Sequence, residues 1–414
     1  MSMEACTLAK VLLIIGAGAE QIPAYQLAKK LGFIVIGSDL NREAPAFKYA
    51  DHVLIASTRN PEETKLKALE FHSSQTISGV MTIANDVPYT VAYVAKALGL
   101  RSISLKAAEN VSDKLLMKQC FNRNNVPCPW FHSIESAEEL TQFIQSNPLQ
   151  RFVLKPVDGR GARGVLLVDK DTDANWAIEE SKRWGDSGRL ILEKYIEGIQ
   201  LSTESFLLNG KCFTPAIAER NYSRLAQFSP NIIEDGGTIP APLDTLMKKK
   251  IDNLIVSGAN ALGIYEGIVK GDLVIDNSGN PMIIELAARL SGGWFATHQI
   301  PEASGVNLVN AVMLHAMGEK IEEASLVPNR DKATAIRYWF PPHGVIKNIQ
   351  GEESLKSVPG LLSYGFFRKM GDYQPPIKMH PDRFGYALVS AENREEALER
   401  VNLAMESIQI EVSS

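Results

Sequence analysis

The chain has 414 residues, too many for one ordinary hydrophobic core, and at roughly 150 residues per domain it corresponds to about three domains. Hydrophobic residues make up 45% and charged residues 22%, values typical of globular proteins that exclude wholesale disorder and fibrous repeats. The formal net charge of −5 argues against the broad basic face of a nucleic-acid binder. No apolar run approaches the ~18 residues of a membrane span, so we expect no membrane partner.

The cysteines argue for a reducing compartment. Cys6, Cys120, Cys128 and Cys212 stand far apart, and none belongs to a CxxC pair. This spacing disfavours a disulfide framework or a zinc site, so we expect reduced thiols and a cytoplasmic protein. The apolar run over residues 11–15 is too short for the core of a signal peptide, and we interpret it as a buried strand.

The first hundred residues alternate short apolar runs with amphipathic segments. The pattern predicts strands over 11–15, 33–37, 53–55 and 79–83, and helices over 21–31, 62–71 and 87–98. Short Val-rich and Ile-rich runs separated by helices favour a parallel, doubly wound sheet.

The rest of the chain changes pattern near Ser112, where an N-capped helix over 113–122 is predicted. Strands around one helix follow over 152–213, and further helices are predicted over 246–262, over 306–317 and from Arg394. Asn393 and Glu396 predict a capping box for the last of these helices. The polar stretch 322–332 resembles a boundary. We therefore predict three domains, 1–110, 111–325 with a lid subdomain over about 126–198, and 326–414.

A glycine turn follows the first predicted strand. Gly16 and Gly18 precede a helix, and Asp39 ends the next strand, which is most of a dinucleotide-binding fingerprint. Gln21 stands where the third glycine or alanine would be. Three interpretations remain open here: a tight turn, an anion site at the helix N-terminus, and a nicotinamide dinucleotide site.

A second glycine-rich segment carries a stronger signal. Lys155 ends an apolar strand, and Gly159, Gly161 and Gly164 follow within a loop that also holds two arginines. Such a loop can fold over a ligand and direct its amides at anionic oxygens. A plain flexible hairpin is the alternative.

Two further segments add acidic groups and a cation. Glu193 lies at the end of an apolar strand, which suits a segment that meets the edge of a heterocycle. Asp272 and Glu285 belong to a predicted hairpin whose alternation turns both to one side. Two carboxylates 4 Å apart repel by about 4 kcal/mol at an effective dielectric near 20, so the pair favours a bridging Mg²⁺, with separated, solvated acids as the alternative. Arg289 and the turn at 291–293 follow, suited to a second anion.

In this order the segments resemble the ATP-grasp superfamily of carboxylate–amine or carboxylate–thiol ligases. Residues 285–293 and the C-terminal region, with Phe340 to Gly344, resemble the L-amino-acid ligase and carbamoyl-phosphate-synthase-like branches. The resemblance implies an ATP-grasp fold of mixed α/β and α+β class. An N-terminal parallel-sheet domain would precede the ATP-grasp domain, and a small α+β domain would follow it.

The resemblance also implies a role for each motif residue. Lys114 and Lys155 would hold the phosphates, and the loop with Gly159, Gly161 and Gly164 would close over them. Arg289 would stabilise an acyl phosphate. The adenine and ribose site would comprise Glu193, Lys194, Tyr195, Ile196 and Gln200, and the metal ligands would be Asp272 and Glu285. Two positions depart from the family pattern, Gln200 in place of a glutamate and Ala287 in place of an asparagine.

The function implied is ATP-dependent joining of a small-molecule carboxylate to an amine, with ATP and Mg²⁺, or Mn²⁺ as an alternative, as cofactors, and with a homodimer as an open expectation. The candidate substrate residues, each with a surface or packing role as its alternative, are Glu204, Arg220, Asn221, Glu234, Ser291, Gly292, Gly293, Trp294 and His298. Two rival functions remain open, a nicotinamide-dependent dehydrogenase that uses Gly16, Gly18 and Asp39, and a non-catalytic nucleotide-binding protein.

Overall fold

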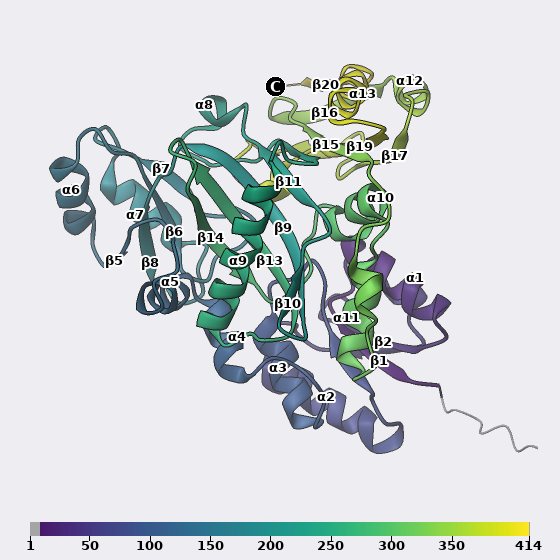
Figure 1. Cartoon of the computed structure of the whole chain (residues 1–414). Helices are drawn as coiled ribbons and strands as arrows, with labels where there is room; N and C mark the ends of the chain where they lie inside the picture. Colours follow the sequence, from purple (N-terminus) through teal and green to yellow (C-terminus); the bar gives the residue numbers. More distant parts are fainter. Residues whose placement is uncertain (1–8, 414) are drawn as a thin grey trace, which may run out of the picture.

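The computed structural model describes residues 9–413, so Cys6 lies outside the described residues. The described residues form four β-sheets, and the long helix α9 (Thr245–Leu262) packs against the central one (Figure 1). In this view the purple N-terminal sheet lies at the lower right, and a small sheet flanked by α6 and α7 lies at the left. The long central sheet joins these parts to the yellow C-terminal region at the top.

The N-terminal sheet is parallel, as the alternation of strands and helices predicts. Its order is β3 (His52–Ile55), β2 (Ile34–Asp39), β1 (Val11–Ile15) and β4 (Gly79–Met81). Every residue of β1 is buried, which accounts for its unbroken apolar sequence. The helices of this region are α1 (Ile22–Lys30), α2 (Pro61–Ser74) and α3 (Pro88–Ala97).

The small sheet has the order β5 (Phe131–Ile134), β8 (Leu190–Lys194), β6 (Phe152–Pro156) and β7 (Leu166–Val168), with antiparallel pairing throughout. Two helices, α6 (Ala137–Ser146) and α7 (Ala174–Lys182), supply the apolar residues that cover it. Because strands alternate in side-chain direction, Phe152 and Leu154 face this core, while Lys155 lies at the far end of β6.

The central sheet runs through the middle of the molecule. Its order is β14 (Pro281–Ala287), β13 (Gly267–Asp276), β9 (Gly198–Leu208), β11 (Ile217–Asn221), β12 (Gly236–Ile239), β15 (Ala333–Trp339), β19 (Gly385–Ala391) and β17 (Leu361–Phe366), and β10 (Lys211–Phe213) pairs with β9. The C-terminal strands thus extend this sheet through the β12–β15 pair. A further sheet of β18 (Tyr373–Gln374), β16 (Gly344–Gln350) and β20 (Gln409–Ser413) completes the C-terminal region.

Two local expectations at helix ends are wrong. The helix α4 (Leu105–Ser112) was not predicted; Ser112 ends it, and Asp113 caps the next helix, α5 (Lys114–Arg123), by accepting from the Leu116 amide. Asn393 caps α13 (Arg394–Glu406), but the Glu396 carboxylate accepts from the Glu392 amide, so the reciprocal bond of a capping box is not formed. Among residues 9–413, no helix is both long and apolar enough to cross a bilayer.

Candidate active site

A cavity of about 770 Å³ lies among the small sheet, the central sheet and the N-terminal domain. Its size is that of a site for a small molecule. The sequence-predicted residues that line it are Lys114, Lys155, Gly161, Glu193, Lys194, Tyr195, Ile196, Gln200, Arg220, Glu234, Asp272, Glu285, Arg289, Ser291, Gly292, Gly293 and Trp294. Of the other candidates, Gly159, Gly164, Glu204, Asn221 and His298 are not among its lining residues.

Two lysines approach the cavity from different elements. Lys114 begins α5, and its ammonium donates to the Gly159 carbonyl oxygen at 2.8 Å and lies 3.3 Å from Glu285 Oε1. Lys155 ends β6 and lies 2.9 Å from Glu193 Oε1. Both ammonium groups therefore border one space, although 41 residues separate them in the chain (155 − 114).

Glu193 also pairs with a lysine that the sequence analysis missed. Lys118 is completely buried, lies 3.5 Å from Glu193 Oε2 and donates to the Ile283 carbonyl oxygen at 3.2 Å. Burial alone would raise the pKa of Glu193, but Lys118 and Lys155 outweigh it and hold the pKa below its ordinary value. The Glu193 carboxylate thus sits between two cations.

Backbone amides at the end of β8 are hydrogen-bonded to neighbouring segments. The Lys194 amide donates to the Trp130 carbonyl oxygen at 2.9 Å, and the Tyr195 amide donates to the Arg151 carbonyl oxygen at 3.0 Å. The amides of Lys194 and Tyr195 are therefore already hydrogen-bonded within the protein. Gln200 donates from its side chain to the Ile196 carbonyl oxygen at 3.3 Å.

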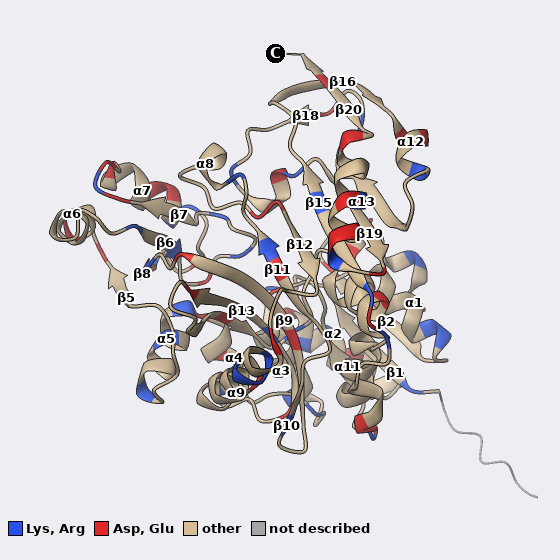
Figure 2. Cartoon of the chain, turned by 45° about the horizontal axis from the view of Figure 1, so that its top comes forward, with Lys and Arg blue, Asp and Glu red and all other residues tan. Residues whose placement is uncertain are grey.

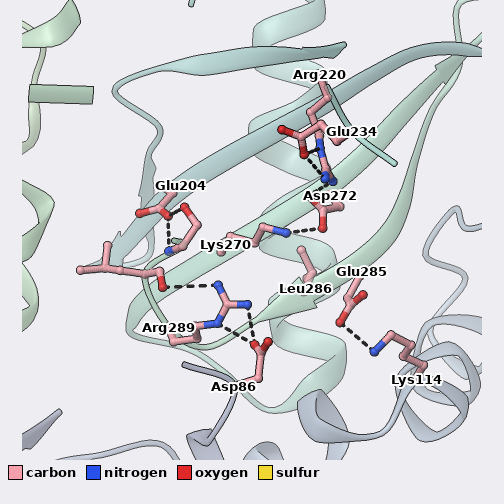
Figure 3. Close-up of polar contacts among 12 residues, drawn as sticks. Asp86, Lys114, Glu204, Arg220, Glu234, Lys270, Asp272, Glu285, Leu286 and Arg289 are labelled. Carbon is pink, nitrogen blue, oxygen red and sulfur yellow. Dashed lines mark hydrogen bonds and ion pairs between the residues drawn. The ribbon is translucent and has the colours of Figure 1, made fainter. Parts of the chain in front are cut away.

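Asp272 and Glu285 lie directly opposite each other on β13 and β14 (Figure 3). Arg220 donates to Asp272 Oδ1 at 2.9 Å, and Lys270 contacts Asp272 Oδ2. Burial alone would raise the pKa of Asp272, but Lys270 and Arg220 lower it to about 2. The predicted carboxylate pair therefore forms, and each member is matched to cations from the cavity wall.

Arg289 joins the central sheet to the N-terminal domain. Its Nε donates to Asp86 Oδ1 at 2.7 Å (Figure 3), and Ile83 forms an isolated parallel bridge with Leu290. Burial would lower the pKa of Arg289, but the Asp86 carboxylate outweighs it and raises the pKa. The guanidinium is therefore a fixed cation in the cavity wall.

Glu204 has a different place from the one expected of a substrate ligand. Its Oε1 accepts from the Ser291 amide at 2.5 Å and also contacts the Ser291 hydroxyl, and the residue is fully buried behind the turn. Burial raises the pKa of Glu204 to about 7, although the two Ser291 hydrogen bonds oppose the shift. Glu204 thus holds the turn that follows Arg289.

The glycine loop touches the C-terminal region. Gly161 and Gly164 have φ values of +62° and +66°, which favour glycine. A Cβ on Gly164 would lie 2.9 Å from the Ser181 carbonyl oxygen, so this glycine serves close packing against α7. The Gly161 carbonyl oxygen accepts from the His380 amide at 3.2 Å. The loop therefore forms part of the cavity wall between the small sheet and the C-terminal region.

The glycine turn at Gly16 and Gly18 is held by hydrogen bonds and contacts from nearby side chains. Asp39 Oδ2 accepts from the Ala17 amide at 3.0 Å, and Asp39 Oδ1 accepts from the Asn41 amide at 3.0 Å. The Gln21 side chain donates to the Ile83 carbonyl oxygen at 2.8 Å, and its Oε1 lies 2.7 Å from where a Cβ on Gly18 would stand. Asp39 thus stabilises a turn, which is the first of the three interpretations.

Comparisons with known proteins place this geometry in a family. The ATP-grasp domain matches residues 111–293, and the L-amino acid ligase C-terminal domain 2 matches residues 337–413. The chain thus contains an ATP-grasp domain, followed by an L-amino acid ligase C-terminal domain. The resemblance drawn from the motifs and the mixed α/β fold are thereby confirmed.

Individual relatives agree with this placement. A phosphoribosylamine–glycine ligase of Halalkalibacterium halodurans is 26% identical to the chain over 228 residues. The alignment covers 51% of this chain and 52% of that protein. The alanine–anticapsin ligase of Bacillus subtilis is 23% identical to the chain over 314 residues. The alignment covers 68% of this chain and 63% of that protein. The structure of an L-amino acid ligase from Bacillus licheniformis superposes with a TM-score of 0.83 at 21% identity, covering 98% of this chain and 99% of that one.

The comparisons support an ATP-dependent ligase that forms C–N bonds. They give no support to the dehydrogenase alternative, which agrees with the closed turn at Asp39. A related carboxyaminoimidazole ribonucleotide synthase is known in complex with ATP, and a related biotin carboxylase domain in complex with ADP and its magnesium salt; Mn²⁺ gains no support.

Several residues in or beside the cavity were not singled out by the sequence analysis. Lys270 precedes Asp272 by two positions on a strand, and this spacing alone could have placed both on one face. Lys118 is one helical turn beyond Lys114. Asp86, Glu20 and Arg383 come from other domains, and only the tertiary fold brings them to the cavity.

Charge in the cavity wall is unevenly balanced. The lining includes nine Lys or Arg residues and six Asp or Glu residues, a formal excess of three positive charges (9 − 6) although the whole chain is acidic. Figure 2 shows a basic segment on β11, which holds one basic residue, Arg220. An excess of cations in a recessed site favours a polyanionic ligand.

Proposed function

We propose that this chain uses ATP to join the carboxylate of one amino acid to the amine of another, and that it releases ADP and inorganic phosphate. The observation that carries the proposal is the gathering of Lys114, Lys155, Arg289 and the Asp272–Glu285 pair around one cavity. The amino-acid class of substrate is supported by the match of residues 337–413 to an L-amino acid ligase domain and by the likeness to the alanine–anticapsin ligase.

In this proposal the nucleotide lies between the small sheet and the central sheet. The Lys114 and Lys155 ammonium groups contact its phosphates, and residues 194–196 with Gln200 face its base and ribose. Binding must exchange existing contacts, because Lys114 now touches Gly159 and Glu285, and Lys155 touches Glu193. Glu193 keeps a cationic partner when Lys155 turns to a phosphate, because Lys118 remains beside it.

The donor set fits Mg²⁺. Within the described part of the chain no group of three or more Asp, Glu, His or Cys side chains could hold a metal alone. Mg²⁺ commonly takes one or two carboxylates and completes its shell with waters and substrate phosphates, and Asp272 and Glu285 supply two opposed carboxylates. When bound there, the ion would neutralise phosphate charge. Lys270, Arg220 and Lys114 hold these two carboxylates in the cavity wall.

The chain's residues then serve two steps. The lysines screen the triphosphate so that the substrate carboxylate can attack the γ-phosphorus in line, which forms an acyl phosphate and ADP. Arg289, held by Asp86, faces the negative charge that develops when an amine attacks the acyl carbon. The loop over 159–164 forms part of the cavity wall beside His380, where it can exclude water from the acyl phosphate.

A screen for ADP release tests the proposal. Wild-type protein with ATP, Mg²⁺ and an equimolar mixture of the common L-amino acids should release ADP, and omission of the amino acids should remove the signal. Lys155→Met should reduce turnover at least ~100-fold with an unchanged circular dichroism spectrum. Lys170→Met, which removes an exposed lysine near the end of β7, is the matched control. Full turnover by Lys155→Met would contradict the proposal.

A further inference from the structure

A carboxylate and a guanidinium from distant parts of the chain lie near each other in the cavity wall. Glu20 lies in the short turn before α1, and Arg383 lies just before β19, so they come from opposite ends of the chain (Figure 1). Both line the cavity. Neither belongs to the motifs that carry the ATP-grasp resemblance.

Glu20 is fixed against the turn that follows Arg289. Its Oε2 accepts from the Gly293 amide at 2.8 Å. A Cβ on Gly292 would lie 2.1 Å from the same oxygen, so a larger residue there would force the Glu20 carboxylate to move. One carboxylate oxygen is thus held by the turn, and the side chain reaches the cavity wall beside Arg289.

Arg383 is almost buried, with 8% of its surface exposed, yet part of its guanidinium lacks a partner. It stacks on the Tyr338 ring at 3.8 Å, and Nη2 donates to the Glu234 carbonyl oxygen at 2.6 Å. Nε is buried without a hydrogen-bond acceptor among the described residues. Nη2 also lies 4.0 Å from Glu234 Oε1. Among the described residues Nη1 has no hydrogen-bond partner and is not among the buried atoms, so it is the nitrogen that a ligand oxygen in the cavity could reach.

We propose that Glu20 and Arg383 receive the amine substrate as an amino-acid zwitterion, Arg383 binding its carboxylate and Glu20 accepting a proton from its ammonium group. The pair matches the two charges of a zwitterion, and Glu20, Arg383 and Arg289 line the same cavity. The inference rests on the proposed function and adds the proton acceptor and the carboxylate anchor of its second step.

The protonation behaviour of Glu20 supports this role. Burial raises its pKa above the ordinary value, although the Gly293 amide, Arg383 and Arg289 oppose the shift. The charged or titratable groups that face it are Arg289, Arg383, Tyr338 and Tyr386. A carboxyl with a raised pKa is a better base toward an ammonium group than an ordinary one.

The step balances. The ammonium group gives one proton to Glu20, and the free lone pair attacks the acyl carbon. The new C–N bond forms, the bond from the acyl carbon to the phosphate oxygen breaks, and inorganic phosphate leaves. A second proton from the nitrogen leaves with the phosphate, and Glu20 later returns its proton to solvent.

Hydroxylamine separates this step from the first one. It is an uncharged nucleophile near neutral pH and has no carboxylate, so it should trap the acyl phosphate as a hydroxamate without help from Glu20 or Arg383. The test supplies ATP, Mg²⁺ and the L-amino-acid mixture with or without hydroxylamine, and measures hydroxamates and dipeptides by mass spectrometry. Glu20→Gln should keep hydroxamate formation within about threefold of wild type and lower dipeptide formation at least ~100-fold.

Arg383→Met is the second variant, and it should likewise keep the hydroxamate and lose the dipeptide. Wild type should prefer amino acids to their α-carboxamides as acceptors, and the variant should lose this preference. Lys369→Met removes an exposed cation of the same region and should behave as wild type. Wild-type dipeptide yields in both variants, or equal loss of hydroxamate and dipeptide, would overturn the inference. Absence of hydroxamate from wild type itself would instead show that the proposed function fails.

Discussion

Lys118 offers the most demanding test of how the nucleotide site is held together. It is wholly buried, and its ammonium lies 3.5 Å from Glu193 Oε2. At that separation and an effective dielectric of 20 the attraction is about 5 kcal/mol before desolvation is counted. Because Glu193 keeps Lys155 at 2.9 Å, we expect Lys118→Met to lower the free energy of unfolding by about 3 kcal/mol, the lower end for breaking a buried pair.

A double-mutant cycle isolates the pair. Glu193→Gln leaves two lysines without a counter-charge, so it should also destabilise the protein. Lys118→Met combined with Glu193→Gln should cost at least ~2 kcal/mol less than the sum of the two single changes. Urea unfolding followed by circular dichroism measures all three variants, with the exposed Lys106→Met as control. A Lys118→Met variant within about 0.5 kcal/mol of wild type, or strict additivity, would refute this reasoning.

Two other predictions concern the turn after Arg289. Burial raises the pKa of Glu204 to about 7 from 4.5, so between these pH values the folded state holds a proton that the unfolded state releases. The contribution of this protonation to the free energy of unfolding is full below pH 4.5 and is lost as the pH rises through about 7. The free energy of unfolding of wild type relative to Glu204→Gln should therefore fall by about 3 kcal/mol from pH ~4.5 to ~8 in urea titrations, and a flat difference would contradict it. Gly292→Ala should displace Glu20, because the new Cβ would stand 2.1 Å from its Oε2, and should lower dipeptide yield at least ~100-fold; normal yield would exclude this close approach in solution.

Much of the fold follows from local pattern. The buried, β-branched run over Val11–Ile15 identified a strand of a parallel sheet, and the ordered motifs from Lys114 to Gly293 identified the ATP-grasp domain. The turn at Gly16 shows the limit of such patterns, because its sequence fits a dinucleotide site while its hydrogen bonds to Asp39 show a closed turn. The domain limits and the role of each site residue stay predictions.

The rest of the site depends on contacts between distant segments. Asp86 and Arg289 are 203 residues apart, and Glu20 and Gly293 are 273 apart, so no local periodicity can pair them. The role of Glu204 was left open by the sequence for the same reason. Strand alternation permits either face, and only the packing of the Ser291 turn shows that its carboxylate lies behind the cavity. Lys270 is the one missed residue that its spacing from Asp272 could have revealed.

The transfer of carboxylate oxygen into phosphate tests the central claim most directly. If the cavity activates a carboxylate as an acyl phosphate, wild-type protein given ATP, Mg²⁺ and L-amino acids labelled with ¹⁸O in their carboxylates should release phosphate that carries one ¹⁸O atom per molecule. Release of ADP with unlabelled phosphate would show that no acyl phosphate forms in this cavity.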